Sequence, residues 1–385
     1  MRGSSRRQFL EQSLAVAASL PFASPRLASG FSLTAAGPRT RPAAAVAIAR
    51  CRTYEDADVH AALASCFDML GGVAPLVAGR TVTVKVNLTG HEFSPFMGLP
   101  VGETYMTHFT TAYQLAALLF GAGARRVRFV ESIGHRTPLE PTLVEAGWDL
   151  HAIGALGTVA YENTRNRGSF ESYAHLRVPE GRMFESFDVN RAYADTDVLV
   201  SLAKLKQHET AGVTLAMKNL FGMTPNSMYG GTPGDEDATA GRLPIHDPGR
   251  SAGLELPGLR PGFRSADAGV RVPHTIADLN AARPIDLAII DGISAITHGE
   301  SRYSAGPSMR VVRPGVLIAG RNAVSVDAVG ASVMGFDPLA PRGQGAFGAC
   351  LNHIALAAER DLGTADIRHI DMRGLPLAQA RCPYV

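Results

Sequence analysis

The chain has 385 residues, of which 46% are hydrophobic and 19% charged, which is the composition of a globular protein and not of a disordered one. Its formal net charge of +2 is concentrated in residues 1–30, which carry four arginines and one glutamate, so the remainder is close to neutral. This excludes a strongly basic surface for nucleic acid or anionic membranes, and no later apolar run is long enough for a permanent membrane span.

The N-terminus resembles a twin-arginine export signal. A serine, the pair Arg6-Arg7, one further residue and a Phe-Leu pair occur in that order, and an alanine-rich apolar run follows over residues 14–23. The run is too short and too interrupted by proline for a membrane helix, which needs about 20 apolar residues. We therefore assign residues 1–36 to a signal peptide with its cleavage region. We expect export of the folded chain by the twin-arginine translocase to the periplasm or beyond; the alternative is a basic leader without an export role.

Strand and helix patterns alternate along residues 43–375. Strand patterns cover residues 43–50, 81–87, 126–131, 197–203, 285–291 and 316–320. Helical patterns cover residues 55–70, 107–120, 139–146, 211–221, 323–334 and 350–360, and Thr107 is the predicted N-cap of the second. This alternation predicts an α/β fold with a largely parallel sheet and helices on both faces, in one large domain or two closely packed lobes.

Residues 224–272 interrupt this alternation. The segment is rich in glycine and proline and has no sustained period. So long a stretch without regular structure inside a compact domain is commonly a lid, a binding loop or a disordered insertion. The sequence leaves a functional lid and a surface insertion equally open.

The four cysteines contain no Cys-x-x-Cys pair, so neither a zinc ribbon nor an iron–sulfur cluster is expected. An exported chain can form disulfides, but their pairing does not follow from sequence, and we expect at least two cysteines to be buried as small hydrophobic residues. A Gly-rich phosphate loop, a His-Glu-x-x-His zinc site and a Gly-x-Ser-x-Gly elbow are all missing from the sequence. The nucleotide-binding and hydrolase classes therefore have no support.

Polar side chains gather where the predicted strands end. They are Lys85, Asn87, Lys204, Lys206, His208, Lys218 and Asn219. Alternation along residues 81–87 points Lys85 and Asn87 away from three valines, and Lys204, Lys206 and His208 share a face if their strand continues. Parallel sheets bind ligands beyond the C-terminal ends of their strands, and converging lysines receive phosphate or carboxylate. These residues therefore predict an anion-binding cleft.

Further polar residues belong to the same predicted edge. His108 begins a helix, where free N–H groups attract anions and lower the pKa of a histidine. Glu131 and Asp291 end strands, His135 lies in the loop after residues 126–131, and Asp327 lies in an apolar helix. Each residue taken alone is equally explained as a helix cap or a hydrogen-bonded core group.

Several of these segments resemble the domain-of-unknown-function 362 proteins. The matching segments include 85–88, Thr107-His108, 204–208, 218–222, Asp291-Gly292 and Asp327. Many members carry a ferredoxin-like cysteine module. This chain has none, so the resemblance implies neither an iron–sulfur cluster nor electron transfer here.

A second resemblance is to lactate racemases that use a nickel-pincer cofactor. These have a Gly-x-His-Arg element after a strand, and a histidine ten residues before the lysine that holds the cofactor. Here Gly134-His135-Arg136 departs by one residue, whereas His208 and Lys218 keep the interval. The resemblance implies His135 and His208 as acid/base groups and Lys218 as an attachment point. No histidine matches the racemases' nickel ligand, His246 being the nearest, so a metal site stays unassigned.

We therefore expect an exported enzyme, of racemase, isomerase or oxidoreductase type, that acts on a small anionic substrate. Its catalytic candidates are His135, His208 and Lys218, and the other polar residues named above bind the ligand. The alternatives are a non-catalytic protein that binds an anionic ligand, and a structural or maturation partner of another protein.

Overall fold

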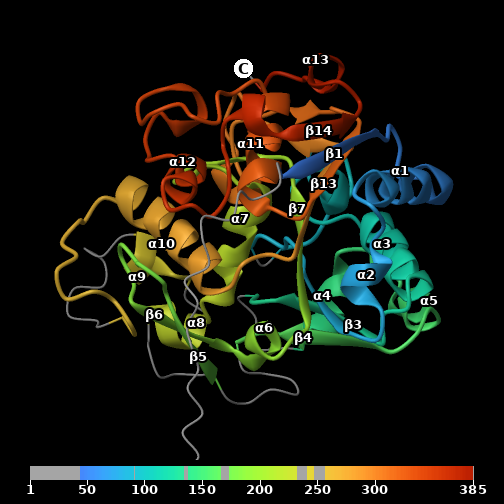
Figure 1. Cartoon of the computed structure of the whole chain (residues 1–385), viewed down its shortest axis with the longest axis horizontal. Helices are drawn as coiled ribbons and strands as arrows, with labels where there is room; N and C mark the ends of the chain where they lie inside the picture. Colours follow the sequence, from blue (N-terminus) through green and yellow to red (C-terminus); the bar gives the residue numbers. More distant parts are fainter. Residues whose placement is uncertain are drawn as a thin grey trace, which may run out of the picture. The chain divides into compact units, whose positions relative to one another are not determined.

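An eight-stranded sheet organises the chain (Figure 1). The computed structural model describes residues 44–90, 92–133, 138–165, 173–231, 241–246 and 256–384. These residues form one large α/β domain with a mostly parallel sheet, which confirms the predicted fold class and selects one domain over two lobes. The predicted signal peptide over residues 1–36 lies outside the described residues, as does His135.

The sheet has the strand order β14-β1-β13-β10-β7-β2-β3-β4. The strands are β14 (Asp371–Gly374), β1 (Ala45–Arg50), β13 (Val316–Gly320), β10 (Leu287–Gly292), β7 (Val198–Lys204), β2 (Thr81–Lys85), β3 (Arg126–Glu131) and β4 (Val159–Asn163). β13 is antiparallel to both of its neighbours, and the other pairs are parallel. The central strands are buried on both sides, which explains their nearly continuous apolar sequences.

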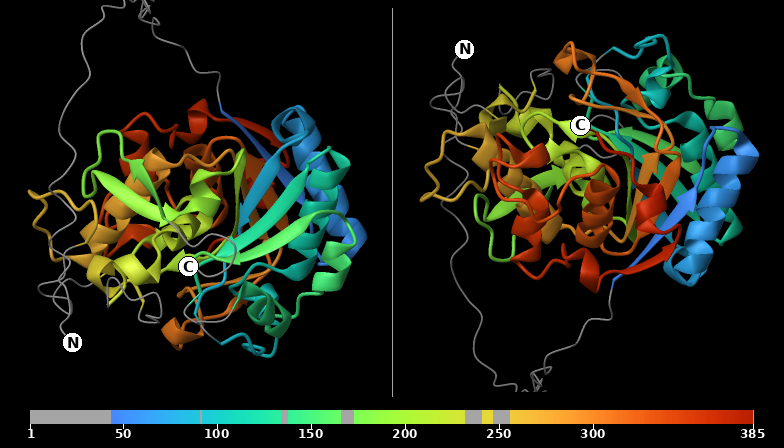
Figure 2. Two further views of the ribbon diagram at one scale, coloured as in Figure 1. Left: turned by 90° about the horizontal axis from the view of Figure 1, so that it is seen from below. Right: turned by 90° about the horizontal axis from the view of Figure 1, so that it is seen from above.

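Helices cover both faces of this sheet (Figure 2). One apolar core lies between the sheet and the helices α1 (Asp56–Met69), α3 (Phe109–Gly121), α4 (Leu139–Glu145) and α5 (Leu150–Gly154). The other lies between the sheet and α7 (Leu215–Asn219), α10 (Ala268–Ala282), α11 (Ala323–Val333) and α12 (His353–Ala358). We call these two sides the α1 face and the α7 face.

Shorter elements lie around the sheet. They are α2 (Ala74–Val77), β5 (Tyr173–Arg177), β6 (Ser186–Asn190), α6 (Arg191–Ala194), β8 (Gln207–His208), β9 (Gly212–Val213), α8 (Asn226–Tyr229), α9 (Leu243–His246), β11 (Ala295–Ile296), β12 (Val311–Val312) and α13 (Leu377–Ala380). The edge strands β4 and β14 and the hairpin β5–β6 had no counterpart among the predicted elements.

Two predicted helix starts are wrong. The helix predicted over residues 211–221 begins only at Leu215, because Gly212 has φ +76° and residues 212–213 form strand β9, which pairs with β8. The N-cap of α3 is His108 and not Thr107, since the His108 ring Nδ1 accepts a hydrogen bond from Thr110 N at 3.1 Å. The strand of Lys204 also does not continue to His208, because β7 ends at Lys204.

The segment 224–272 contains regular structure in its described parts. It includes α8, α9 and the first turn of α10. The buried Arg271 donates to Ile245 O at 3.0 Å and to Pro244 O at 2.9 Å, which fastens α9 to α10. The expectation of a stretch without regular structure is therefore wrong for these parts, and residues 232–240 and 247–255 lie outside the described residues.

The cysteines are all free thiols, and Cys51, Cys66 and Cys350 are buried in the apolar cores, as expected for small hydrophobic residues. Within the described ranges, none of the helices has the length and apolar character required to cross a bilayer.

Candidate functional site

Polar residues end neighbouring parallel strands at one edge of the sheet. Lys85 is the last residue of β2, Glu131 of β3 and Lys204 of β7. The register of β7 and β10 places Asp291 beside Lys204. The polar edge that the sequence predicts is therefore present.

The two lysines leave the sheet on opposite faces. Val82 and Val84 of β2 pack into the core on the α1 face, so Lys85, one residue out of phase, points to the α7 face. Leu202 of β7 also packs on the α1 face, and Lys204, two residues later, points the same way. Lys204 therefore does not reach the space that Lys85 lines.

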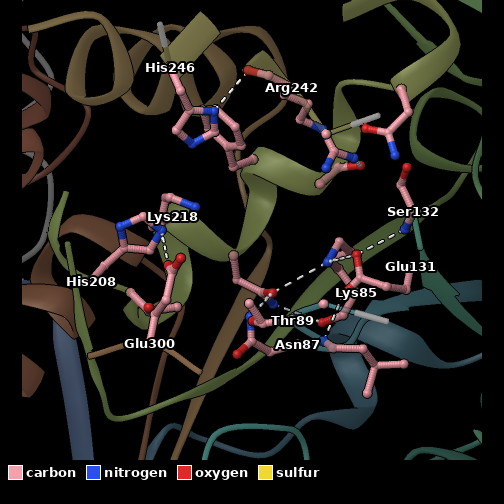
Figure 3. A pocket seen from close by; sticks show the side chains of 18 residues that line it. Lys85, Asn87, Thr89, Glu131, Ser132, His208, Lys218, Arg242, His246 and Glu300 are labelled. Atoms are coloured by element: carbon pink, nitrogen blue, oxygen red, sulfur yellow. Dashed lines mark hydrogen bonds and ion pairs between the residues drawn. The ribbon is translucent and has the colours of Figure 1, made fainter. Parts of the chain in front are cut away.

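A cavity of about 310 Å³ lies on the α7 face beyond the ends of β2 and β3 (Figure 3). Its polar lining comes from the strand ends, from α7 and from the segment 224–272. The polar side chains that line it belong to Lys85, Asn87, Thr89, Glu131, Ser132, His208, Thr214, Lys218, Asn219, Asn226, Arg242, His246 and Glu300. The volume is at the lower end of the range for small-molecule sites, about 300–1,000 Å³.

Lys85 and Glu131 form a buried ion pair at one wall of the cavity. Lys85 Nζ lies 2.5 Å from Glu131 Oε1, and it also donates to Val86 O at 2.7 Å. Glu131 in addition accepts hydrogen bonds from Leu88 N and Ser132 N, both at 2.9 Å. A Cβ on Gly222 would lie 2.7 Å from Lys85 Cε, so the pair needs a glycine at that position. Both charges are thus compensated within the protein.

Asn219 of α7 fixes the orientation of Asn87. Asn219 Nδ2 donates to Lys85 O and to Ser201 Oγ, both at 3.1 Å, so its Oδ1 faces Asn87 and accepts from Asn87 Nδ2 at 3.0 Å. Because this network assigns the two amide ends, the other end of Asn87, its Oδ1, is an acceptor on the cavity side.

Three buried polar atoms on the cavity lining have no hydrogen-bond partner among the described residues. They are Asn87 Oδ1, Ser132 Oγ and Asn226 Oδ1, on side chains that are 7%, 7% and 3% exposed. Buried polar groups are normally paired, and leaving one unpaired costs about 1–3 kcal/mol. These atoms therefore mark positions where a ligand or ordered water supplies a hydrogen bond.

His208 and Glu300 form a second pair at the opposite wall. Thr210 N–H donates to His208 Nδ1 at 3.1 Å, so in the neutral ring Nε2 carries the hydrogen and donates to Glu300 Oε2. Burial lowers the pKa of His208. Burial raises the pKa of Glu300, but the hydrogen bond from His208 and the charges of Lys218 and Lys206 bring it below its ordinary value. Both ring nitrogens of His208 are therefore engaged.

Asp327 of α11 positions the short helix that carries Lys218. Its Oδ1 accepts from Ala216 N at 2.8 Å and its Oδ2 from Met217 N at 2.9 Å. Leu215, the first residue of α7, has φ +50°, which is unusual for a residue with a Cβ. Asp327 thus holds the first turn of α7 in place after this sharp start, and it does not line the cavity.

Lys218 projects from α7 into the cavity. Among the described residues its ammonium has no hydrogen-bond or ion-pair partner, and its Nζ lies 4.4 Å from the centroid of the Phe221 ring. Burial lowers the pKa of Lys218 to about 8; Arg242 and Lys85 act in the same direction, and Glu300 opposes them. A partly buried cation without a counter-ion favours binding of an anion.

Arg242 and His246 enter the cavity from the segment 224–272. Arg242 donates from Nε to Thr224 O at 2.5 Å and from Nη2 to Gly222 O at 3.2 Å, so part of its five-donor guanidinium remains for a ligand. His246 Nδ1 lies 2.8 Å from Arg242 O and must donate to it, which leaves Nε2 as a lone-pair acceptor. Burial and the Lys218 charge lower the pKa of His246 to about 4. His246 is therefore neutral near pH 7.

Lys204 and Asp291 form a separate buried group on the α1 face. Lys204 Nζ donates to Tyr54 OH at 2.7 Å and to Asp291 Oδ2 at 3.1 Å, and Thr111 Oγ1 donates to the same carboxylate. His108 stacks on Tyr54 with ring centroids 3.7 Å apart. The three predicted ligand-binding residues of this group do not line the cavity, because β7 and β10 direct Lys204 and Asp291 to the α1 face, where His108 caps α3.

Lys206 is buried beside the cavity and is fully hydrogen-bonded. Its Nζ donates to Thr89 Oγ1 at 3.0 Å, to Tyr105 O at 2.7 Å and to Glu300 O at 2.8 Å. Burial lowers its pKa to about 7, but three oxygen acceptors stabilise the ammonium form. Lys206 therefore ties together the loops that carry Thr89 and Glu300, and it does not line the cavity.

Of the predicted site residues, the structure brings together Lys85, Asn87, Glu131, His208, Lys218 and Asn219. The main residues missed as site residues are Asn226, Arg242 and Glu300, together with His246, which the sequence suggested only as the nearest histidine. Arg242 and His246 lie in the segment without a sustained period, so no pattern places them. The scarcity of lysine is a further signal in the sequence for the location of the site. The chain has 33 arginines and only four lysines, and all four lysines are at this edge of the sheet.

The described residues contain no group of three His, Cys, Asp or Glu side chains arranged to hold a metal ion.

Comparison with known proteins places the chain in a family. A 27% identical segment of 191 residues is shared with the thylakoid-associated protein sll1697 of Synechocystis sp., and covers 48% of this chain and 51% of that relative, about half its length. A crystal structure of a protein from Thermotoga maritima aligns with 70% of this chain and with 56% of its own chain, at 12% sequence identity. The TM-score is 0.35, and no conclusion is drawn from this likeness. The family model described as "Domain of unknown function (DUF362)" matches residues 82–332. The chain belongs to this DUF362 family.

Proposed function

We propose that the cavity binds a small anionic ligand and that the protein is an enzyme acting on it. The observation that carries this proposal is Lys218, a cation on the cavity wall without a hydrogen-bond or ion-pair partner among the described residues. Arg242 adds guanidinium donors on the same cavity that no described residue accepts. An anion bound between Lys218 and Arg242 would form ion pairs with both cations and so neutralise positive charge on the cavity wall.

The charges around the cavity agree with this proposal. Lys85, Lys218 and Arg242 are positive, and Glu131 and Glu300 are negative. Glu131 is already paired with Lys85. Glu300 keeps its negative charge, because its partner His208 is neutral. Lys218, Arg242 and Glu300 together therefore leave one net positive charge, and Figure 3 shows the Lys218 and Arg242 side chains directed toward the cavity.

An acid/base group beside this charge favours an enzyme over a binding protein. His246 is neutral and has a free lone pair at Nε2, whereas both nitrogens of the predicted catalytic residue His208 are engaged. A neutral imidazole in a small cavity suits transfer of a proton to or from a bound ligand. His246 is therefore the preferred acid/base candidate among the described residues, and His208 positions Glu300.

Thermal-shift titrations with sodium phosphate, acetate, lactate and pyruvate test the binding. At least one of these anions should raise the wild-type free energy of unfolding by RT ln(1 + [L]/Kd), and the melting temperature should rise steadily with the logarithm of its concentration above Kd. Lys218→Met should abolish the rise. Arg313→Met, which removes one positive charge from an exposed position outside the cavity, should keep it. Equal responses of the two variants would contradict the proposed site.

NMR spectra of the same mixtures separate an enzyme from a binding protein. An enzyme converts one of the bound anions, and His246→Gln slows the conversion while the melting shift persists. A saturable shift without any conversion would favour the non-catalytic alternative.

A lysine-held cofactor is the second candidate, and the unpaired amine of Lys218 favours it. His208 and Lys218 keep the interval seen in the nickel-pincer racemases, both line the cavity, and the amine is free for attachment. When bound, such a group would supply hydride chemistry. Intact mass and metal analysis of protein from its native host test it: a mass excess on Lys218 with stoichiometric nickel is expected, and an unmodified metal-free chain would reject it.

We also propose export through the twin-arginine pathway, supported by the Arg6-Arg7 motif and the apolar run after it. Fractionation of the native host should find the mature chain outside the cytoplasm. Replacing both arginines by lysine should retain it inside as the precursor. Normal export of that variant would contradict the proposal.

A further inference from the structure

We propose that Lys218 is a nucleophilic amine that forms a Schiff base with the carbonyl carbon of a small oxo-acid bound in the cavity. This inference rests on the proposed function and names its substrate class: a carboxylate that carries a ketone or an aldehyde. The carboxylate of this substrate binds the guanidinium of Arg242. Its carbonyl group reacts with the amine of Lys218, which has no hydrogen-bond or ion-pair partner among the described residues.

The first argument is how the protein uses its lysines. Lys85 is paired with Glu131, Lys204 with Asp291, and Lys206 donates to three oxygens. Such contacts occupy the nitrogen of each of these lysines with partners inside the protein, so it is not free to approach a bound carbonyl group. Lys218 has none of them among the described residues, and it is the lysine whose surroundings leave the amine available.

The second argument is the choice of residue type. The chain uses arginine 33 times and lysine four times. Arginine binds carboxylates in a bidentate manner and keeps its charge, so it is the better residue for anion binding alone. A lysine at this position supplies what an arginine does not, an amine that loses its proton and attacks an electrophile.

The third argument is the electrostatic environment. Lys218 is partly buried and lies near the charges of Arg242 and Lys85. Burial and these like charges favour the neutral amine against the opposing charge of Glu300, and the pKa of Lys218 is lowered to about 8. About a tenth of the amine is therefore neutral at pH 7, and this is the form that the reaction needs.

The reaction is balanced without a further reagent. The Lys218 ammonium first loses one proton, which His246 Nε2, a neutral acceptor on the same cavity, takes up. The lone pair of the resulting amine attacks the carbonyl carbon, a C–N bond forms as the C=O π bond breaks, and a second proton moves from nitrogen to oxygen. His246 then returns the first proton to the hydroxyl, the C–O bond breaks and water leaves, so an ammonium and a carbonyl give a protonated imine and one water molecule.

Unpaired acceptors on the lining suit the intermediate. Before water leaves, the former carbonyl oxygen is a hydroxyl group, which donates a hydrogen bond. Asn87 Oδ1 and Asn226 Oδ1 are buried acceptors without a partner among the described residues. A hydroxyl formed in the cavity supplies one donor, which one of these two atoms accepts.

Reductive trapping tests the inference. Purified full-length protein is incubated with pyruvate or glyoxylate and sodium cyanoborohydride, and modified residues are located by intact mass and peptide mapping. With only four lysines, the map is simple. We expect one adduct, on Lys218, that Lys218→Arg removes while its circular dichroism spectrum stays native. Propionate, which has a carboxylate but no ketone or aldehyde group, should form no adduct, but it should slow the trapping of pyruvate or glyoxylate by competing for the cavity.

The outcomes separate this inference from the proposed function. If pyruvate raises the melting temperature but no adduct forms on Lys218, the Schiff base is rejected and anion binding stands. If neither a melting shift nor an adduct appears, both are rejected. Adducts spread over the other lysines, or a cofactor already attached to Lys218 in protein from the native host, would also overturn the inference.

Discussion

Replacing Lys218 by methionine should stabilise the unliganded protein. Methionine has a similar length and no charge, so it removes a partly buried ammonium without a counter-ion. The pKa of Lys218 falls from its ordinary value of 10.5 to about 8. At about 1.4 kcal/mol per pKa unit this shift corresponds to roughly 3 kcal/mol. Because the side chain is partly exposed, solvent screens part of this destabilising effect. We therefore expect Lys218→Met to raise the free energy of unfolding by about 1–3 kcal/mol at pH 7.

The sign of the pH dependence follows from linkage. Between pH 8 and pH 10.5 the unfolded chain binds more protons at Lys218 than the folded chain does. The wild-type free energy of unfolding therefore gains from Lys218 as the pH rises through this window. The difference between Lys218→Met and wild type should be largest below pH 8 and should shrink toward pH 10.5.

Urea unfolding of both proteins at pH 7 and pH 10 measures this difference, and Lys85→Met is the matched control. Lys85 lines the same cavity but is paired with Glu131, so its loss leaves a buried carboxylate without a partner. We expect Lys85→Met to destabilise by about 3–5 kcal/mol. A Lys218→Met variant that is less stable than wild type at pH 7 would refute the reasoning that Lys218 is unpaired.

Three further changes test the supports of the site. Asp327→Asn leaves one acceptor oxygen for two N–H groups of α7, so urea unfolding should show a free energy of unfolding lower by about 1–3 kcal/mol. Anion affinity should also fall because Lys218 shifts with α7. An unchanged stability would contradict this role of Asp327. Gly222→Ala places a Cβ 2.7 Å from Lys85 Cε, and should destabilise by about 1–3 kcal/mol in the same assay, whereas Lys85→Met combined with it should show less than the sum. Glu300→Gln should lower the free energy of unfolding by about 1–3 kcal/mol above pH 5. This loss should shrink as the pH falls, because the pKa of Glu300 is lowered in the folded protein. A loss that grows toward acid pH would show the opposite pKa shift.

The sequence predicts the sheet because its signals are local. The apolar run 316–320 and the strand pattern over residues 126–131 are both observed as strands with those bounds. Alternation along residues 81–87 also assigns Lys85 to the face opposite Val82 and Val84, as observed. These predictions depend only on a strand's own period.

The cavity required information that a single strand does not carry. Lys85 and Lys204 both end parallel strands, but whether they share a face depends on the phase of each strand, and they do not. Lys206 follows a break at the end of β7 that the apolar pattern does not reveal. Arg242 and His246 reach the cavity from a Gly- and Pro-rich segment whose path is set by tertiary contacts, such as those of Arg271 with α9.

The central claim is that Lys218 is a cation without an ion-pair partner among the described residues and that it receives an anion. Its Nζ pKa can be measured by NMR after selective labelling of lysine, since the chain has only four lysines and Lys218→Arg identifies the signal. We predict a pKa of about 8 without ligand, and a rise when phosphate or another binding anion saturates the cavity. A pKa at the ordinary value of 10.5, or one that does not change when an anion binds, would contradict the account.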